Sequence, residues 1–123
     1  MSKVLLVEDD QILIEMYEMK MKEGGLNLLL ASDGETGLEL ARKELPSVIL
    51  LDVMMPKMDG FAVLTELKKD EKTKDIPVLL LTNLGQQADI EKGQKLGASD
   101  YIVKSSLTPT QVLEKIKEYL KQK

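Results

Sequence analysis

The sequence predicts a doubly wound α/β sandwich, in which five parallel strands alternate with five helices in a (βα)5 arrangement. Two observations predict it. Short apolar runs of strand length alternate five times with segments of helical periodicity. Residues 47–51 and 76–81 are almost wholly apolar, which is typical of strands covered by helices on both faces of a parallel sheet. A chain of 123 residues is long enough for one domain with a substantial core and too short for two.

The first strand is expected at residues 3–7, where four apolar residues follow a lysine. The first helix is expected at residues 10–23, and Gly24 and Gly25 end it. Its apolar residues recur at spacings of three and four positions: Ile12, Leu13, Met16, Tyr17 and Met19. The second strand, at residues 26–31, follows directly.

The second helix is expected to open at Ser32, because Glu35 three residues later completes the pattern of a capping box. It runs to about residue 44, and Pro46 stops it. The third strand follows at residues 47–51.

The third helix begins at Asp59, and three of its residues form the expected buried stripe: Phe61, Leu64 and Leu67. A polar loop leads to the fourth strand, at residues 76–81. The fourth helix, at residues 86–96, has the weakest pattern, because its apolar stripe is thin and Gly93 lies inside it.

The fifth strand is short and covers residues 101–103. Thr108 is expected to cap the last helix, with Pro109 at its first position and Gln111 completing a capping box. The inner face of this helix is expected to contain five residues: Val112, Leu113, Ile116, Tyr119 and Leu120.

Composition excludes several classes of function. The chain contains no Cys and no His, which excludes disulfides, zinc sites, thiol chemistry and Ser-His-Asp triads. A bound metal therefore needs oxygen ligands, which suit magnesium, manganese or calcium. The net charge of −4 and the lack of a basic stripe argue against nucleic acid as the main partner. No signal peptide precedes the first strand and no apolar run approaches membrane-spanning length, so a cytoplasmic location is expected.

Polar residues stand at the ends of four of the expected strands. Glu8 and Asp9 follow the first strand, Asp52 the third, Thr82 the fourth and Lys104 the fifth. Ligands of an open parallel sheet bind at the carboxyl ends of its strands, so these side chains are expected to converge. Converging carboxylates repel unless a cation or protons lie between them. The set of carboxylates, hydroxyl and ammonium suits phosphoryl transfer onto Asp52 beside a hard cation.

Each of these residues also has an ordinary structural interpretation when it is taken alone. Glu8 and Asp9 precede a helix, where acids act as caps and as partners of the helix dipole. Asp52 and Thr82 precede loops and are common turn residues. Lys104 follows a strand, and a lysine in that position is most often solvated. Their shared position at one edge of the predicted sheet favours the functional interpretation.

Over its whole length the chain resembles the receiver domain of two-component response regulators. The most specific stretches are residues 6–10, 50–60 and 97–104. The resemblance implies a flavodoxin-like fold with strand order 2-1-3-4-5. It also implies a single receiver domain over residues 1–123, of the stand-alone chemotaxis type without an output domain.

The resemblance implies a phosphoacceptor and a metal site. Asp52 is the expected acceptor of a phosphoryl group from a histidine kinase or a phosphotransfer protein. Asp9 is the expected direct ligand of Mg²⁺, or of Mn²⁺, together with Asp52. Glu8 is expected to assist, often through water, and Met54 to contribute its backbone carbonyl.

The resemblance further implies a switch with a protein partner as its output. Thr82 and Lys104 are the expected contacts of the phosphoryl group, and rotation of Tyr101 is expected to accompany switching. The face formed by the fourth helix, fifth strand and fifth helix is expected to change and to alter binding of a downstream protein. The implied protein is a monomer or a phosphorylation-dependent dimer, binds neither nucleic acid nor membrane, and catalyses only its own phosphorylation and dephosphorylation.

The chain departs from the pattern of this family in three respects. Ser105 follows Lys104 where the family usually has proline, so the loop there is expected to be built differently. Asn83 replaces a small residue and is expected to narrow access to the phosphoryl group. Met54 and Leu84 offer no polar side chain to orient an attacking water, so a long-lived aspartyl phosphate is expected.

Two other classes of function compete with this interpretation. A small phosphatase or phosphomutase would use Asp52 as a transient nucleophile, but Met54 stands where such enzymes usually carry a second acid. A flavin-binding protein of the same fold needs a phosphate loop rich in Ser, Thr or Gly after the first strand. Glu8, Asp9 and Asp10 stand there instead and would repel phosphate.

Overall fold

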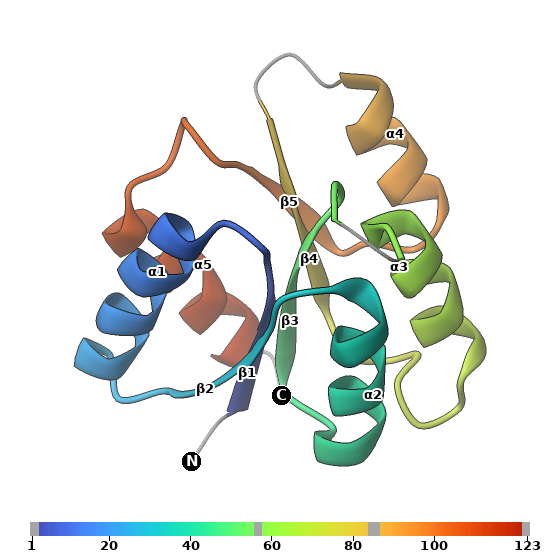
Figure 1. Cartoon of the computed structure of the whole chain (residues 1–123), viewed down its shortest axis with the longest axis horizontal. Helices are drawn as coiled ribbons and strands as arrows, with labels where there is room; N and C mark the ends of the chain where they lie inside the picture. The colour runs from blue at the N-terminus through green and yellow to red at the C-terminus, as the bar shows by residue number, and fades with distance from the viewer. Residues whose placement is uncertain (1–2, 56–57, 84–86, 122–123) are drawn as a thin grey trace.

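The computed structural model describes residues 3–55, 58–83 and 87–121 and has the predicted (βα)5 architecture (Figure 1). Within these residues, strands and helices alternate in the order β1 (Lys3–Val7), α1 (Gln11–Glu23), β2 (Asn27–Ala31), α2 (Gly34–Glu44), β3 (Val48–Asp52), α3 (Gly60–Lys69), β4 (Val78–Thr82), α4 (Gln87–Lys95), β5 (Asp100–Val103) and α5 (Pro109–Lys121).

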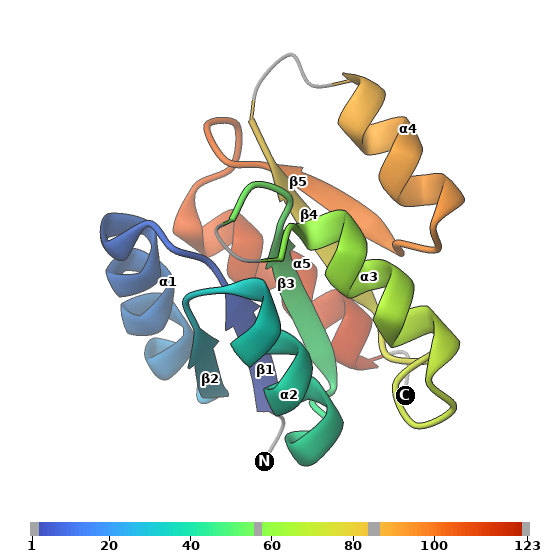
Figure 2. The same ribbon diagram turned by 45° about the vertical axis from the view of Figure 1, so that its right-hand side comes forward.

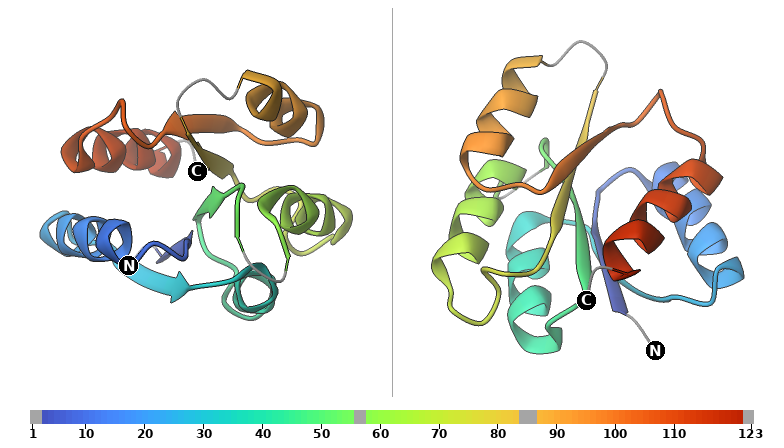
Figure 3. Two further views of the ribbon diagram at one scale, coloured as in Figure 1. Left: turned by 45° about the horizontal axis from the view of Figure 1, so that its top comes forward. Right: turned by 180° about the vertical axis from the view of Figure 1, so that it is seen from behind.

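The strands form one parallel sheet in the order β2-β1-β3-β4-β5, which confirms the predicted order. Helices α1 and α5 lie on one face of the sheet, and α2, α3 and α4 lie on the other (Figures 2 and 3). The chain leaves β1 for the edge strand β2 and then returns to β3 on the other side of β1. The carboxyl ends of β1 and β3 are therefore neighbours at the point where strand order reverses, which is where such sheets bind ligands.

The sheet separates two hydrophobic clusters. Leu5 and Val7 of β1 face α2 and α3, whereas Val4 and Leu6 face α1 and α5. This alternation follows from the period of two in a strand. β3 and β4 are buried along their whole length, as their apolar sequences predict. The buried strands give the polar residues at their carboxyl ends a rigid support.

Helix α1 buries only part of the apolar set that its spacing indicated: Tyr17 is buried and Leu13 half-buried. The other three residues of that set are largely exposed: Ile12 (71% exposed), Met16 (41%) and Met19 (67%). The buried residues are Ile14, Tyr17 and Met21, which also recur at spacings of three and four positions. The helix has two apolar stripes, so its spacing alone does not decide which one packs on the sheet.

The cap of α2 is one residue later than expected. Asp33, rather than Ser32, is the N-cap, and its carboxylate accepts a hydrogen bond of 2.8 Å from the backbone N–H of Thr36. The predicted capping box of Ser32 and Glu35 is therefore wrong. The predicted box of α5 is confirmed, because Thr108 and Gln111 exchange hydrogen bonds between side chain and backbone of 2.9 and 3.2 Å.

The remaining predictions for helices and strands hold to within two residues. β3 extends one residue further, to Asp52, and β4 covers Val78–Thr82 instead of residues 76–81. Leu64 and Leu67 are buried as expected. Residue 86 of the predicted fourth helix lies outside the described residues. None of the described helices has the length and apolar character needed to cross a bilayer.

Candidate functional site

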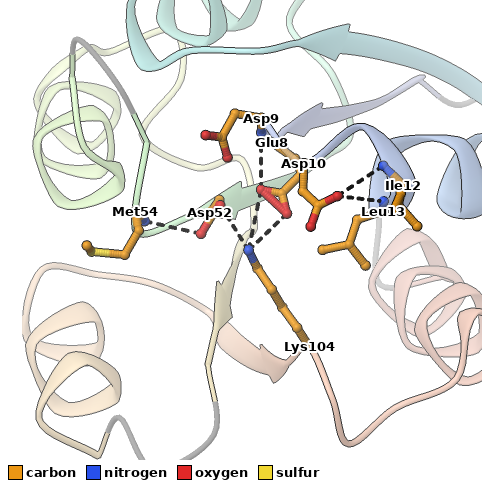
Figure 4. Close-up of polar contacts among 8 residues, drawn as sticks. All are labelled: Glu8, Asp9, Asp10, Ile12, Leu13, Asp52, Met54 and Lys104. Carbon is orange, nitrogen blue, oxygen red and sulfur yellow. Dashed lines mark hydrogen bonds and ion pairs between the residues drawn. The ribbon is translucent and has the colours of Figure 1, made fainter.

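Three charged side chains from different strand ends meet at the carboxyl edge of the sheet (Figure 4). The ammonium nitrogen of Lys104, which follows β5, lies 2.9 Å from Oε1 of Glu8 and 3.0 Å from Oδ2 of Asp52. Glu8 is fully buried and Asp52 is 2% exposed. Both carboxylates are thus held away from bulk water. A buried carboxylate without a partner of opposite charge would cost folding free energy.

The backbone around each residue fixes its position. Glu8 continues the pairing of β1 with β2, because its N–H donates to the carbonyl of Ala31 at 3.0 Å. Lys104 is held in the same way, because its N–H donates to the carbonyl of Thr82 at 2.9 Å. Oδ1 of Asp52 accepts a hydrogen bond of 3.1 Å from the N–H of Met54. The acids and the lysine therefore belong to the sheet and to the first residues after it.

Asp10 is a structural residue of this region. Its carboxylate accepts hydrogen bonds from the N–H groups of Ile12 (3.0 Å) and Leu13 (3.4 Å) and so caps α1. This use of Asp10 leaves the two preceding acids, Glu8 and Asp9, for the site.

The three acids of the predicted metal site form a compact cluster. One carboxylate oxygen from each of Glu8, Asp9 and Asp52 lies within 4.8 Å of the other two. Asp9 is exposed, so the cluster opens to solvent on that side. An all-oxygen donor set with net negative charge fits a hard divalent cation such as Mg²⁺ or Mn²⁺. The residues present therefore fit the implied metal.

Crowding of these charges shifts two pKa values. Burial, together with the hydrogen bond and charge of Asp52, raises the pKa of Glu8 from 4.5 to about 8, although Lys104 opposes the rise. Burial alone would lower the pKa of Lys104, but its hydrogen bonds to Glu8 and Asp52 outweigh burial and raise it above 10.5. One ammonium group thus compensates the two buried carboxylates only in part, and a cation is the natural further partner.

The raised pKa of Glu8 predicts how metal-free stability depends on pH. Between about pH 4.5 and pH 8 the folded protein retains a proton on Glu8 that the unfolded chain has lost. The contribution of Glu8 to the free energy of unfolding therefore falls as pH rises through that window, by up to about 1.4 kcal/mol per pH unit. Outside the window this contribution is constant. Urea unfolding at several pH values, in the presence of a metal chelator, measures this pH dependence. Glu8→Gln should be less pH-dependent than the parent, and equal slopes would contradict the assignment.

Thr82 ends β4, and Tyr101 lies on β5, the strand that Lys104 follows. Thr82 is fully buried at the end of β4, and within the described residues its hydroxyl has no hydrogen-bond partner. A buried hydroxyl without a hydrogen-bond partner is unusual in a folded protein. Tyr101 on β5 is 37% exposed, and Met54 is 67% exposed.

All three departures from the family pattern lie at least partly within the described residues. The Lys104–Ser105 peptide bond is trans. Asn83 is exposed, and Leu84 lies outside the described residues.

Comparison with known protein families identifies the family of the chain. Residues 4–117 match the model of the response regulator receiver domain. The chain belongs to this family. The predicted resemblance and fold class are thereby confirmed, and the receiver's class of function is phosphorylation-dependent two-component signalling.

Individual relatives support the same family. The receiver is 40% identical over 121 residues to the probable transcriptional regulator ycf27 of Guillardia theta, a match that covers 98% of the receiver and 46% of the relative. It therefore spans less than half the length of that relative. Among solved structures, the chemotaxis response regulator CheY4 of Vibrio cholerae is similar with a TM-score of 0.89 and 29% identity, covering 97% of the receiver and 98% of CheY4.

A metal-bound structure is also similar to the receiver. The Mn²⁺-bound form of response regulator Rcp1 has a TM-score of 0.84 and 27% identity, with 98% of the receiver and 94% of Rcp1 covered.

Sequence reasoning missed two features of the site. It expected Glu8 to assist the metal, often through water, and did not predict the ion pair with Lys104 in which the receiver buries Glu8 completely. It also gave no role to Gly34 and Gly60, although both lie against the backbone around the loop that follows Asp52. Neither feature has a sequence signal, because both depend on distances between residues far apart in the chain.

Proposed function

We propose that Asp52 accepts a phosphoryl group from a phosphohistidine of a histidine kinase or phosphotransfer protein. The observation that carries this is the position of its carboxylate, 3.0 Å from the ammonium of Lys104 and within the acid cluster of Glu8 and Asp9. An oxygen of Asp52 attacks phosphorus, the P–N bond breaks, and the imidazole keeps the electron pair. Lys104 offsets the charge that develops on the phosphoryl oxygens.

Glu8, Asp9 and Asp52 are the proposed side-chain ligands of Mg²⁺, and Met54 the proposed carbonyl ligand. The divalent ion, when bound, neutralises charge on the acids and on the phosphoryl oxygens. The compact oxygen cluster supports this assignment, and the Mn²⁺-bound form of the similar Rcp1 is in keeping with it. Asp9 is the most accessible of the three acids, which suits exchange of the ion with solvent.

Thr82 is the proposed link between the phosphoryl group and the output surface. Its hydroxyl, which has no partner among the described residues, can donate to a phosphoryl oxygen. Such an oxygen is present only when Asp52 is phosphorylated. Thr82 pairs with Val103 across the β4–β5 ladder, and its carbonyl accepts from the N–H of Lys104. A shift of Thr82 therefore acts directly on β5, which carries Tyr101.

The face formed by α4, β5 and α5 is the proposed output surface for a downstream protein. A groove of about 330 Å³ lies on this face beside β5, and Tyr101 and Lys115 are among its lining residues. A protein partner suits this groove, and we propose a monomer, or a dimer formed on phosphorylation. Several relatives, ycf27 among them, are named as transcriptional regulators, but the receiver spans less than half of each. Its contact with nucleic acid is not part of the proposal.

We treat the receiver as a stoichiometric acceptor and not as a phosphatase. Met54 follows Asp52 by two residues and offers no acid for a second step of turnover. The apolar side chain of Met54 and the exposed Asn83 also support the proposal of a long-lived aspartyl phosphate.

Thr82→Val should separate phosphorylation from switching. The variant should still reach one phosphoryl group per chain with acetyl phosphate and Mg²⁺, although more slowly. In the parent, amide shifts on phosphorylation should concentrate in residues 82–96 and 101–106. In the variant, those of residues 101–106 should be largely lost, because the reporting hydroxyl is gone. Backbone NMR measures both.

Thr73→Val is the matched control for this experiment. Thr73 is also buried, but its hydroxyl donates to the carbonyl of Leu67 at 2.7 Å. Its loss should cost about 1 kcal/mol of stability and leave the switching shifts intact. Thr82→Val should cost less, because no hydrogen bond is lost. Full shifts at residues 101–106 in Thr82→Val, or shifts concentrated in residues 25–44 of the parent, would contradict the proposed route.

A further inference from the structure

The loop between β3 and α3 rests against the first residue of α2. That residue, Gly34, is buried, and a β-carbon there would lie 2.0 Å from the carbonyl oxygen of Met58 and 2.8 Å from its carbonyl carbon. These are backbone atoms, so no side-chain rotation relieves the contact. Met58 also packs against the hydrophobic cluster between the sheet and α2 and α3. Only glycine permits so close an approach of helix and loop.

A second glycine holds the same loop at its other end. Gly60 is the first residue of α3, and a β-carbon there would lie 2.3 Å from the carbonyl oxygen of Asp52. The N–H of Gly60 donates to the carbonyl of Val53 at 3.1 Å. These contacts join the two ends of the loop next to Asp52, the proposed phosphoacceptor. Met54, the proposed carbonyl ligand, lies between the two points at which the loop is held.

Helix α2 is in turn fixed against β1. One turn after Gly34, a β-carbon on Gly37 would lie 2.8 Å from each methyl carbon of Val7. Val7 directly precedes Glu8 and Asp9, two of the three acids of the cluster. The same helix therefore touches β1, which ends in these acids, and the loop that follows Asp52.

We propose that Gly34 is a positioning residue for the metal site. By leaving room for the Met58 carbonyl, it lets α2 hold the end of the β3–α3 loop. Gly60, two residues further on, carries this contact to Asp52 and Val53, and so keeps the adjoining Met54 at a fixed distance from Glu8 and Asp9. Gly34 touches neither metal nor phosphoryl group and acts only through this loop. The inference rests on the proposed function, because it names a residue that sets the geometry of the same site.

Gly34→Ala tests the role through its effect on the dependence of labelling on Mg²⁺. An added methyl group must displace the loop or the helix, so the Mg²⁺ concentration for half-maximal labelling by acetyl phosphate should rise at least about tenfold. At saturating Mg²⁺ the labelling rate should fall less than about threefold, because Asp52 and Lys104 are unchanged. General destabilisation would not produce this separation. An unchanged Mg²⁺ dependence in Gly34→Ala would overturn the proposal.

Gly24→Ala is the matched control, since its β-carbon would also crowd a neighbour, at 2.9 Å. That neighbour is the flexible side chain of Leu113, which packs in the hydrophobic cluster on the opposite face of the sheet from α2. This variant should keep the Mg²⁺ dependence of the parent. A parent that takes no phosphoryl group contradicts the proposed function. A labelling parent with an unaffected Gly34→Ala contradicts only the role of Gly34.

A titration of the parent with Mg²⁺ alone decides the case if Gly34→Ala does not fold. In backbone NMR, the amides of Gly34 and Met58 should shift with the same midpoint as that of Met54, and the amide of Gly24 should stay in place. A shift of Met54 without a shift of Gly34 would show that helix and loop are not coupled, and would overturn the inference.

Discussion

Asp52→Asn should abolish phosphorylation by acetyl phosphate or phosphoramidate, with a loss in initial labelling rate of about 10³-fold or more. The amide that replaces the carboxylate is a poor nucleophile and carries no charge to hold Mg²⁺. Asp52 is 2% exposed and its carboxylate accepts a hydrogen bond from Lys104, so asparagine of the same shape should fold in its place. Intact mass spectrometry of the two proteins over time measures the loss. Removal of Mg²⁺ with a chelator should have the same effect on the parent.

Asp59→Asn is the control for this comparison. Asp59 is an exposed acid seven residues further along the chain, and it caps α3 by accepting from the N–H of Ala62 at 2.9 Å. Asparagine is an equally good N-cap, so this variant should fold and label like the parent. If Asp52→Asn labels as fast as Asp59→Asn, the nucleophile has been assigned to the wrong residue.

Magnesium should raise the melting temperature of the parent, and Asp9→Asn should remove most of the gain. At 100 times its dissociation constant, a ligand of the folded state adds about 2.7 kcal/mol, which is roughly 10 °C for a domain of this size. Asp9 supplies one of the three clustered carboxylates, so its loss weakens the site directly. The same change removes a negative charge beside Glu8 and Asp52. Metal-free Asp9→Asn should therefore melt above the metal-free parent.

Asp10→Asn gives a control one residue away. Asp10 caps α1, and asparagine caps equally well, so the Mg²⁺ shift should be retained in full. Thermal unfolding with and without Mg²⁺ in the three proteins provides the test. Equal Mg²⁺ shifts in Asp9→Asn and the parent would show that Asp9 is not a ligand.

The fold was predictable because its determinants are local. Largely apolar strands that alternate with amphipathic helices leave few architectures, and each strand was found within two residues of its predicted position. The edge at which Glu8, Asp52 and Lys104 meet was predictable for the same reason, since parallel strands place their carboxyl ends together. These inferences needed no knowledge of side-chain packing.

What the sequence did not reveal depends on three-dimensional packing. The spacing of α1 did not separate its buried residues from its exposed ones, because Ile12, Met16 and Met19 form a second apolar row beside the buried one. The α2 cap was mistaken by one residue because Ser32 and Asp33 are both good caps, and tertiary geometry selects Asp33. The approach of the α2 N-terminus to the β3–α3 loop joins segments 24 residues apart and leaves no periodic trace in the sequence.

Chemical identification of the modified residue tests the central claim most directly. Parent protein incubated with acetyl phosphate and Mg²⁺ is treated with borohydride, which reduces an aspartyl phosphate to homoserine, and peptides are sequenced by tandem mass spectrometry. We expect one homoserine per modified chain, at position 52, and none when Mg²⁺ is chelated. Homoserine at another aspartate, or complete absence of modification in the presence of Mg²⁺, would contradict the assignment of Asp52 as the phosphoacceptor.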